Sequence, residues 1–214
     1  MSNLKSFISR KVLRRRGASP AREARVWSNE FIAQIAPRVE GRVVNVSAWK
    51  DEDKQGRSYR SYFTNAASYE TTNYQGWRGE GVPSDHDVDL QRPAPEALQG
   101  AFDLVFNHTT LEHVFDFHRA LDTLCEMSRD AVLVIVPWMQ HLHGPEDGDF
   151  WRFSPYAMRR LLADRGFEIV AEQAGPKGGN VRYLGYLAAR NVASWRARLG
   201  DLTNDAPGIS GEAI

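Results

Sequence analysis

The sequence predicts a three-layer α/β domain in which helices cover both faces of a mostly parallel β-sheet. Strand-like runs of β-branched and apolar residues alternate with helical stretches along most of the chain, as they do in parallel sheets with crossover helices. Only a short turn over 175–180 separates the last two strand-like runs, which favours an antiparallel pair there. The 214 residues provide enough volume for one core.

Serine–proline pairs mark the beginnings of two helices. Ser19 is expected as an N-cap with Pro20 at the first helical position, and this helix ends at Pro37. A second such pair opens a helix within 153–167. The remaining expected elements are helices over 58–66 and 116–128, and strands over 41–49, 68–74, 86–90, 102–107, 131–138, 167–174 and 181–190.

Charge separates a basic N-terminal segment from an acidic remainder. The net charge is zero, with 27 Lys and Arg against 27 Asp and Glu. Residues 1–27 hold eight of the basic side chains and a single acidic one, Glu23, so the remainder holds 19 and 26. Apolar residues at helical spacing within 4–12 predict a basic amphipathic helix. Such a helix can contact an anionic membrane surface, bind nucleic acid or dock on an acidic protein surface, and the acidic remainder disfavours nucleic acid.

The chain is expected to divide into N-terminal basic and amphipathic helices over 1–37, a main domain over 38–198 and a flexible tail over 199–214. Its one cysteine, Cys125, excludes an internal disulfide and favours a reducing compartment, so we expect a cytoplasmic protein. No apolar stretch reaches the roughly 20 residues that span a bilayer. Contact with the inner membrane surface through 1–27 is compatible with these features.

Three sets of residues, taken together, resemble class I S-adenosylmethionine-dependent methyltransferases. The spacing of "VVNVSAW", "SYETTNY" and "HDVDL" fits the first three strands of that family, and "FDLVFNHTTLEHV" resembles its fourth strand with the helix that follows. The stretch "DGDFWRFSPYAMRRLLADRGFEIV" resembles a segment of members encoded beside polysaccharide biosynthesis enzymes. The resemblance covers about residues 40–190. It implies a Rossmann-like methyltransferase fold, S-adenosylmethionine as cofactor, and an oxygen acceptor on a saccharide or glycan precursor.

The resemblance also implies a cofactor site with a diverged glycine-rich loop. Where the family has an acidic residue followed by Gly-x-Gly, this chain has Asn45, then Ser47 and Trp49 in place of the two glycines. Asn73 stands at the position of the acid that binds the ribose hydroxyls, and Asp89 at a position that often faces the adenine amino group. The resemblance therefore assigns all five residues to cofactor binding.

The sequence leaves open which further residues bind the cofactor and where the Trp49 side chain lies. Asn107, at the end of the fourth expected strand, is a further cofactor-binding candidate, and Glu70 is a weaker alternative to Asn73. Trp49 either packs outward or stacks on the ligand, or its indole fills the pocket for the methionine end of the cofactor. An amide binds a ribose with about half the strength of a charged carboxylate.

His108 and Asp149 are the candidate catalytic residues. His108 directly follows the strand over 102–107, so it is expected at the carboxyl edge of the sheet, where ligands of open α/β sheets gather. A neutral imidazole there can remove a proton from an acceptor hydroxyl. The alternative is that His108 caps the turn through Thr109 or Thr110.

The loop "QHLHGPEDGDFWRF" after the fifth expected strand is predicted to cover an acceptor site. His141, His143 and, from the preceding loop, His113 are expected to contact the acceptor, and Trp151 is expected to stack on a sugar face. Arg152 either forms an ion pair with a nearby carboxylate or binds an anionic group of the substrate. The histidine spacing matches no defined metal motif, so no metal is expected.

A second function is also compatible with the sequence. The missing glycines and the two asparagines in place of acids favour a methyltransferase-like protein that serves in binding or assembly without transferring methyl groups. The polar residues around His108 and Asp149 favour retained chemistry.

Overall fold

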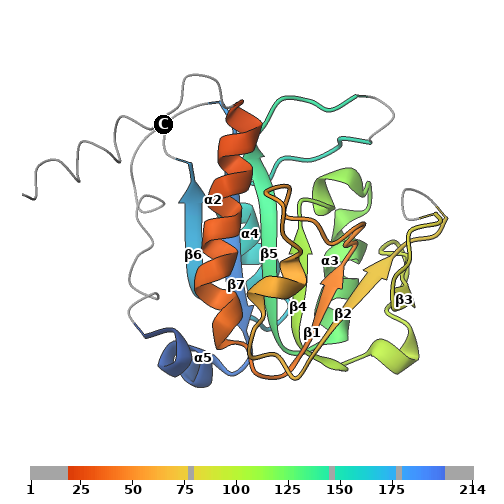
Figure 1. The fold of residues 1–214 in the computed structure, drawn as a ribbon, viewed down its shortest axis with the longest axis vertical. Coiled ribbons are helices and arrows are strands. Elements are labelled where there is room, and N and C mark those ends of the chain that lie inside the picture. Colours follow the sequence, from red (N-terminus) through yellow and green to blue (C-terminus); the bar gives the residue numbers. More distant parts are fainter. Residues whose placement is uncertain (1–18, 77–79, 145–147, 177–179, 201–214) are drawn as a thin grey trace, which may run out of the picture.

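The computed structural model describes residues 19–76, 80–144, 148–176 and 180–200. They form a seven-stranded sheet in the order β3-β2-β1-β4-β5-β7-β6 (Figure 1). Strand β7 pairs antiparallel with both β5 and β6, and the other neighbours pair parallel. This confirms the predicted mostly parallel sheet with an antiparallel last strand. The strands are β1 Arg42–Val46, β2 Ser68–Asn73, β3 His86–Asp87, β4 Phe102–His108, β5 Ser128–Met139, β6 Glu168–Gly175 and β7 Arg182–Ala189.

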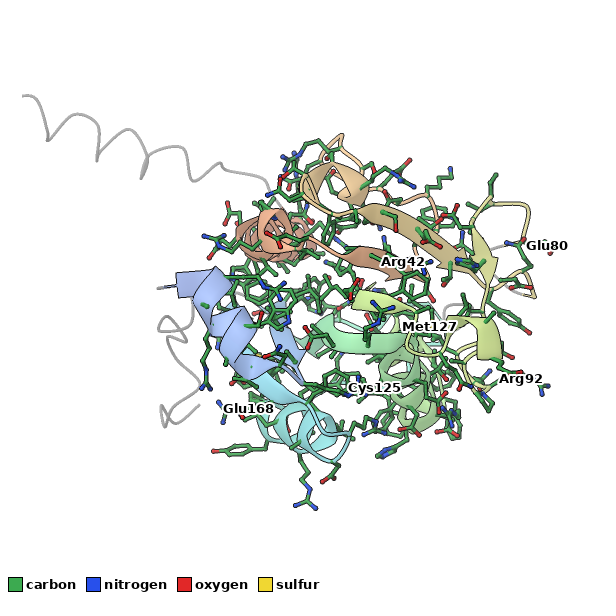
Figure 2. The ribbon with its side chains drawn as sticks, turned by 90° about the horizontal axis from the view of Figure 1, so that it is seen from below. Arg42, Glu80, Arg92, Cys125, Met127 and Glu168 are labelled. Atoms are coloured by element: carbon green, nitrogen blue, oxygen red, sulfur yellow. The ribbon has the colours of Figure 1, made fainter. Side chains whose placement is uncertain are left out.

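Helices cover both faces of this sheet, as predicted (Figures 1 and 2). Helices α2 (Pro20–Ile35) and α5 (Val192–Leu199) pack on one face, whose buried residues include Leu104 and Phe106. Helices α3 (Phe117–Met127) and α4 (Pro155–Ala163) pack on the other face, which includes Val105. The alternation along β4 follows from the two-residue period of a strand and gives the domain two cores.

Both predicted N-caps are confirmed. The Ser19 hydroxyl oxygen accepts a hydrogen bond from the backbone N–H of Arg22, and that of Ser154 accepts one from Ala157. Helix α2 ends at Ile35 and continues as one 3-10 turn over Ala36–Arg38, which contains the expected proline stop.

Two segments are less regular than the sequence suggested. The helix expected over 58–66 is a 3-10 turn over Tyr59–Tyr62, and the stretch after β4 forms another over Leu111–His113. Tertiary packing holds the first of these, because the Tyr59 ring packs edge-on against Phe106 of β4 with centroids 5.2 Å apart. Strand β5 begins at Ser128, directly after α3.

Helix α2 lies directly against the backbone of β7. A Cβ atom on Gly185 would fall 2.6 Å from the Phe31 ring, so only glycine allows this approach. The close packing brings Arg25 and Ser28 of α2 to the carboxyl end of β4, where both contact His108.

Two expectations fall on residues outside these ranges. The basic amphipathic helix predicted within 4–12, and positions 201–214 of the predicted tail, lie outside the described residues. Among the helices that the structure describes, none has the length and apolar content required to cross a membrane.

Candidate functional site

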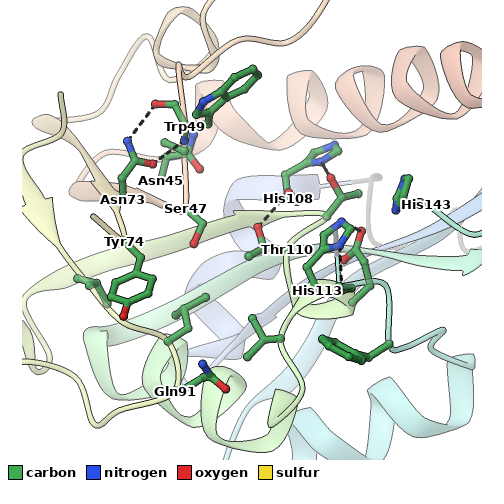
Figure 3. A pocket seen from close by; sticks show the side chains of 18 of the residues that line it. Asn45, Ser47, Trp49, Asn73, Tyr74, Gln91, His108, Thr110, His113 and His143 are labelled. Carbon is green, nitrogen blue, oxygen red and sulfur yellow. Dashed lines mark hydrogen bonds and ion pairs between the residues drawn. The ribbon is translucent and has the colours of Figure 1, made fainter. Parts of the chain in front are cut away.

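A cavity of about 1020 Å³ opens at the carboxyl ends of β1, β2 and β4. Parallel strands place these ends at one edge of the sheet, so polar residues distant in sequence meet there. The cavity has two sides (Figure 3). The β1–β2 side comprises Asn45, Ser47, Trp49, Asn73 and Asp89, and the β4–β5 side comprises Arg25, His108, Glu112, His113 and His143.

The loop after β1 adopts left-handed backbone without any glycine. Ser47, Trp49 and Asp51 have φ angles of 59°, 49° and 56°. Each such residue costs about 1–2 kcal/mol relative to ordinary backbone. The Asp51 carboxylate offsets part of this cost, because Asn45 Nδ2 and the Tyr69 hydroxyl both donate to its Oδ1, at 2.8 and 2.6 Å.

Trp49 packs outward, which was one of the alternatives that the sequence left open. Its side chain is 48 % exposed, and the Lys50 ammonium lies 5.0 Å from the ring centroid. The Asn73 carboxamide holds its backbone, accepting from the Trp49 N–H at 2.7 Å and donating to the Trp49 carbonyl at 3.1 Å. The indole therefore stands at the wall of the cavity and does not fill it.

The remaining cofactor candidates differ in their position. Asp89 lines the cavity, and its Oδ1 accepts from the backbone N–H of Gln91 at 2.9 Å. Asn107 is buried outside the cavity and donates to the Val46 carbonyl at 2.9 Å. Strand alternation explains this difference from the prediction, because Asn107 faces the opposite side of β4 from His108. Glu70 pairs with Arg42 and His86 and also lies outside the cavity.

His108 lies at the predicted edge and is held by a helix that sequence reasoning did not connect with it. The Arg25 guanidinium, which can only donate, lies 2.7 Å from Nδ1. The same Arg25 nitrogen lies 3.1 Å from Nε2, but Ser28 Oγ, 2.9 Å from Nε2, already donates its proton to the Arg25 carbonyl. We therefore assign Nε2 as the protonated atom, which donates to Ser28 Oγ, and Nδ1 as the acceptor. The Thr109 hydroxyl also contacts Nδ1, at 2.9 Å, which is the contact expected of a turn cap.

Electrostatics keep the His108 ring neutral. Burial is the main cause of a pKa well below the usual 6.5, and the Arg25 charge lowers the pKa further. A neutral imidazole is thus present at neutral pH, with its unprotonated nitrogen already in contact with Arg25.

Glu112 is the least satisfied polar group of the cavity. Its side chain is fully buried, and neither carboxylate oxygen accepts a hydrogen bond from another of the described residues. Burial raises its pKa to about 8. Its Oε1 lies 3.8 Å from Nε2 of His113.

Asp149 and Arg152 fix the loop after β5 and do not line the cavity. The Arg152 guanidinium binds the Asp149 carboxylate in a fork, at 2.5 and 2.6 Å, and the Asp149 side chain is only 3 % exposed. This ion pair lowers the pKa of Asp149 to about 2. Arg152 also donates to the carbonyl oxygens of Gln140 and His141. Of the two roles weighed for Arg152, the ion pair is present, and it engages the carboxylate of Asp149, the second predicted catalytic residue, behind the cavity wall.

Trp151 is also placed differently from its predicted role. Its indole N–H donates to the carbonyls of Val114 and Phe115 at 3.1 and 3.0 Å, and the ring packs on Phe117. Phe115 and Phe150 line the cavity instead, 67 % and 50 % exposed, with ring centroids 5.3 Å apart. The exposed His141 side chain lies outside the cavity.

Sequence reasoning missed several lining residues. Arg25, Lys54 and Tyr183 belong to segments with no local signal for a site, and Phe150 stands next to the larger Trp151, to which the prediction was given. Of the predicted site residues, the structure brings together Asn45, Ser47, Trp49, Asn73, Asp89, His108, His113 and His143.

Neither a family model nor a curated protein matches the sequence. Solved structures do match the fold. The magnesium protoporphyrin IX methyltransferase of Synechocystis PCC 6803, crystallised with bound S-adenosylhomocysteine, has a TM-score of 0.54 and 11 % identity over 88 % of this chain and 95 % of that one. A S-adenosylmethionine-dependent methyltransferase of Aquifex aeolicus has a TM-score of 0.53 and 12 % identity over 86 % and 97 %.

The chain has the class I methyltransferase fold. The [4+2]-cyclase SpnF is also similar, with a TM-score of 0.57 and 13 % identity over 83 % of this chain and 84 % of that chain. Because one of these similar structures is a cyclase, the fold by itself does not determine the reaction.

Proposed function

We propose that the protein transfers a methyl group from S-adenosylmethionine to an oxygen atom of a saccharide or glycan precursor. The observation that carries the proposal is the two-sided cavity at the carboxyl edge of a class I methyltransferase fold. Its β1–β2 side holds the positions that the resemblance assigns to the cofactor, and its β4–β5 side supplies polar groups for an acceptor. A volume of about 1020 Å³ leaves room for both molecules.

The β1–β2 side fits the cofactor in three respects. Asp89 presents a carboxylate to the cavity for the adenine amino group, and the outward position of Trp49 leaves space for the methionine end. Ser47 and Asn73 lie where the ends of β1 and β2 meet and would contact the methionine and ribose parts. Bound there, S-adenosylmethionine supplies an electrophilic methyl group.

The β4–β5 side supports a hydroxylated acceptor. The exposed rings of Phe115 and Phe150 offer apolar faces, and Thr110 and Gln140 offer hydrogen-bonding groups beside them. The methyl transfer depends mainly on aligning the acceptor oxygen with the methyl group. As the C–O bond forms and the C–S bond breaks, the acceptor proton passes to His108 Nδ1, once the hydroxyl has replaced Arg25 at that atom.

A second function, binding or assembly without transfer, is favoured by one observation. Asn45 and Asn73 use their carboxamides to hold the loop after β1, so neither presents a free charged group to a ribose. In this alternative, the β1–β2 side no longer binds S-adenosylmethionine, and a ligand binds only at the β4–β5 side.

Calorimetric titration of the purified full chain with S-adenosylmethionine and S-adenosylhomocysteine separates the two functions. We expect micromolar binding, and ligand at 100 times its dissociation constant should add about 2.7 kcal/mol of stability. Asp89→Ala should weaken binding, whereas Asp164→Ala, on the exposed end of α4, should not. Absence of binding at millimolar ligand would contradict the transferase proposal and favour the second function.

The role of His108 is tested once turnover is measured. His108→Gln should reduce kcat by about 100-fold or more, which is the low end for loss of a general base. Unchanged turnover in a folded His108→Gln protein would show that the acceptor proton leaves by another route.

A further inference from the structure

Two histidines and a carboxylate converge at the β4–β5 side of the cavity. Ligand atoms of His113, His143 and Asp149 all lie within 4.8 Å of one another. The two imidazole rings face each other, with centroids 5.0 Å apart and a tilt of 33° (Figure 3). His113 comes from the 3-10 turn after β4, and the other two come from the loop after β5, so the fold alone brings them together.

The hydrogen bonds of His113 orient one nitrogen toward this cluster. Its Nδ1 lies 3.3 Å from the Gly148 carbonyl oxygen, which can only accept, so Nδ1 carries the proton. The Nε2 atom is then the unprotonated one and lies 3.8 Å from Glu112 Oε1. Donation of one ring N–H to a backbone carbonyl is usual for a metal-binding histidine.

His143 has a matching arrangement. Its Nε2 contacts the Gln140 side-chain amide at 2.6 Å, while Gln140 Oε1 and His143 Nδ1 are both buried without a hydrogen-bond partner among the described residues. Amide nitrogen and oxygen are interchangeable in such an assignment. With the Gln140 oxygen turned to accept from Nε2–H, Nδ1 presents its lone pair, 3.5 Å from Asp149 Oδ2.

Glu112 provides an independent indication of a ligand. Its carboxylate is fully buried, adjoins His113, and accepts no hydrogen bond from another described residue. Buried carboxylates are normally paired with a cation or bound to a metal. Arg152 already pairs with Asp149, so Glu112 is the carboxyl group beside His113 whose oxygens accept no hydrogen bond from another described residue, and a bound cation would stabilise its charged form.

We propose that His113 Nε2, His143 Nδ1 and the carboxylates of Glu112 and Asp149 bind a divalent transition-metal cation of the zinc type. Mixed imidazole and carboxylate ligands suit this class of ion and not Mg²⁺ or Ca²⁺. Ligand atoms around a tetrahedral zinc lie roughly 3.3–3.6 Å apart. The ligand atoms of His113, His143 and Asp149, which lie within 4.8 Å of one another, would therefore approach one another by about one ångström when the ion binds.

The position of the cation indicates what it would do. It lies beside Phe115 and Phe150 at the acceptor end of the cavity, where it would bind an acceptor hydroxyl and lower the pKa of that hydroxyl. This role rests on the proposed methyl transfer, whereas the binding of the cation does not.

Zinc titration of the full chain by calorimetry, without S-adenosylmethionine, tests the site. We expect a single Zn²⁺ per chain at micromolar affinity or tighter, and a visible absorption band when Co²⁺ replaces Zn²⁺. His113→Ala and His143→Ala should each weaken Zn²⁺ binding by about 100-fold, since loss of even an indirect partner costs 10- to 100-fold. Glu112→Gln should weaken it as well.

His141→Ala is the matched control, because this exposed histidine lies two positions from His143 and outside the cluster. Its Zn²⁺ affinity should equal that of the unchanged chain. Three results would overturn the site: no binding of Zn²⁺, Mn²⁺ or Co²⁺ at millimolar concentration, binding that survives both histidine substitutions, or binding lost in His141→Ala. Zinc binding without cofactor binding would refute the transferase proposal and leave the metal site standing.

Discussion

The two sides of the cavity are built in opposite ways. On the β1–β2 side, the side chains of Asn45 and Asn73 form hydrogen bonds with a single local segment, the loop after β1. On the β4–β5 side, side chains from α2, β4 and the loop after β5 meet, and Glu112 and His143 Nδ1 are left without hydrogen bonds from other described residues. Buried polar groups without partners are costly, so the β4–β5 side is where a ligand gains most by binding. The polar groups without partners thus lie in the part of the cavity that long-range contacts assemble.

The largest effect is expected from the ion pair that fixes the loop after β5. Asp149→Asn leaves the Arg152 charge without its partner and should lower the free energy of unfolding by about 2–3 kcal/mol. Breaking a fully buried ion pair costs about 3–5 kcal/mol, and the loss is smaller here because Arg152 is partly exposed. Chemical denaturation measures it. Asp164→Asn, in an exposed pair with Arg160, should have no measurable effect, and an equal loss in both variants would refute the special role of the Asp149 pair.

The packing of α2 should be next in size. Gly185→Ala places a methyl group 2.6 Å from the Phe31 ring and should cost about 1–3 kcal/mol of stability through overpacking. Because α2 carries Arg25, the same substitution should loosen the contacts of His108. Adding Phe31→Leu should restore part of the stability. A Gly185→Ala protein as stable as the unchanged chain would show that α2 can shift without cost.

A third prediction concerns the neutral ring of His108. The folded protein keeps the pKa of this group well below 6.5, so below about pH 6.5 the unfolded chain binds a proton that the folded chain does not. The contribution of His108 to the free energy of unfolding is therefore fully present above about pH 6.5. It is lost as the pH falls below that value, by at most about 1.4 kcal/mol per pH unit. His108→Gln should unfold with a shallower dependence on pH in urea titrations on either side of 6.5.

Arg25→Met sharpens the same prediction. Removing the Arg25 charge should raise the pKa of His108 in an NMR titration. Burial, the larger cause, should still keep that pKa below the usual value. An unchanged pKa would show that Arg25 does not act on the ring electrostatically.

The smallest effect is expected on the β1–β2 side. Ser47→Gly relieves a left-handed residue at φ 59° but adds freedom to the unfolded chain, so we expect a net gain of about 0.5 kcal/mol. Ala48→Gly, next to it and without a positive φ, should instead lose about 0.5–1 kcal/mol. Thermal unfolding of the two variants in parallel gives the sign of each change.

Local sequence patterns predicted the fold and the edge of the sheet at which the cavity opens. Strand and helix periods, the caps at Ser19 and Ser154 and the short link between the last two strands are local signals. Both caps and the antiparallel pairing of β6 with β7 are confirmed, whereas the helix predicted over 58–66 is a 3-10 turn. The same signals placed His108 at the carboxyl end of β4. Local patterns carry this information because hydrogen bonding and side-chain alternation repeat over a few residues.

How the residues of the cavity contact one another depends on long-range packing, which no local pattern predicts. Arg25 contacts His108 from 83 positions away, and this contact exists because α2 docks on Gly185 of β7. The exposure of Trp49 and the burial of Glu112 likewise depend on which neighbours surround each side chain. These neighbours come from segments that are distant in the sequence. Their packing depends on the whole core, so a short stretch of sequence does not predict which residues will be in contact.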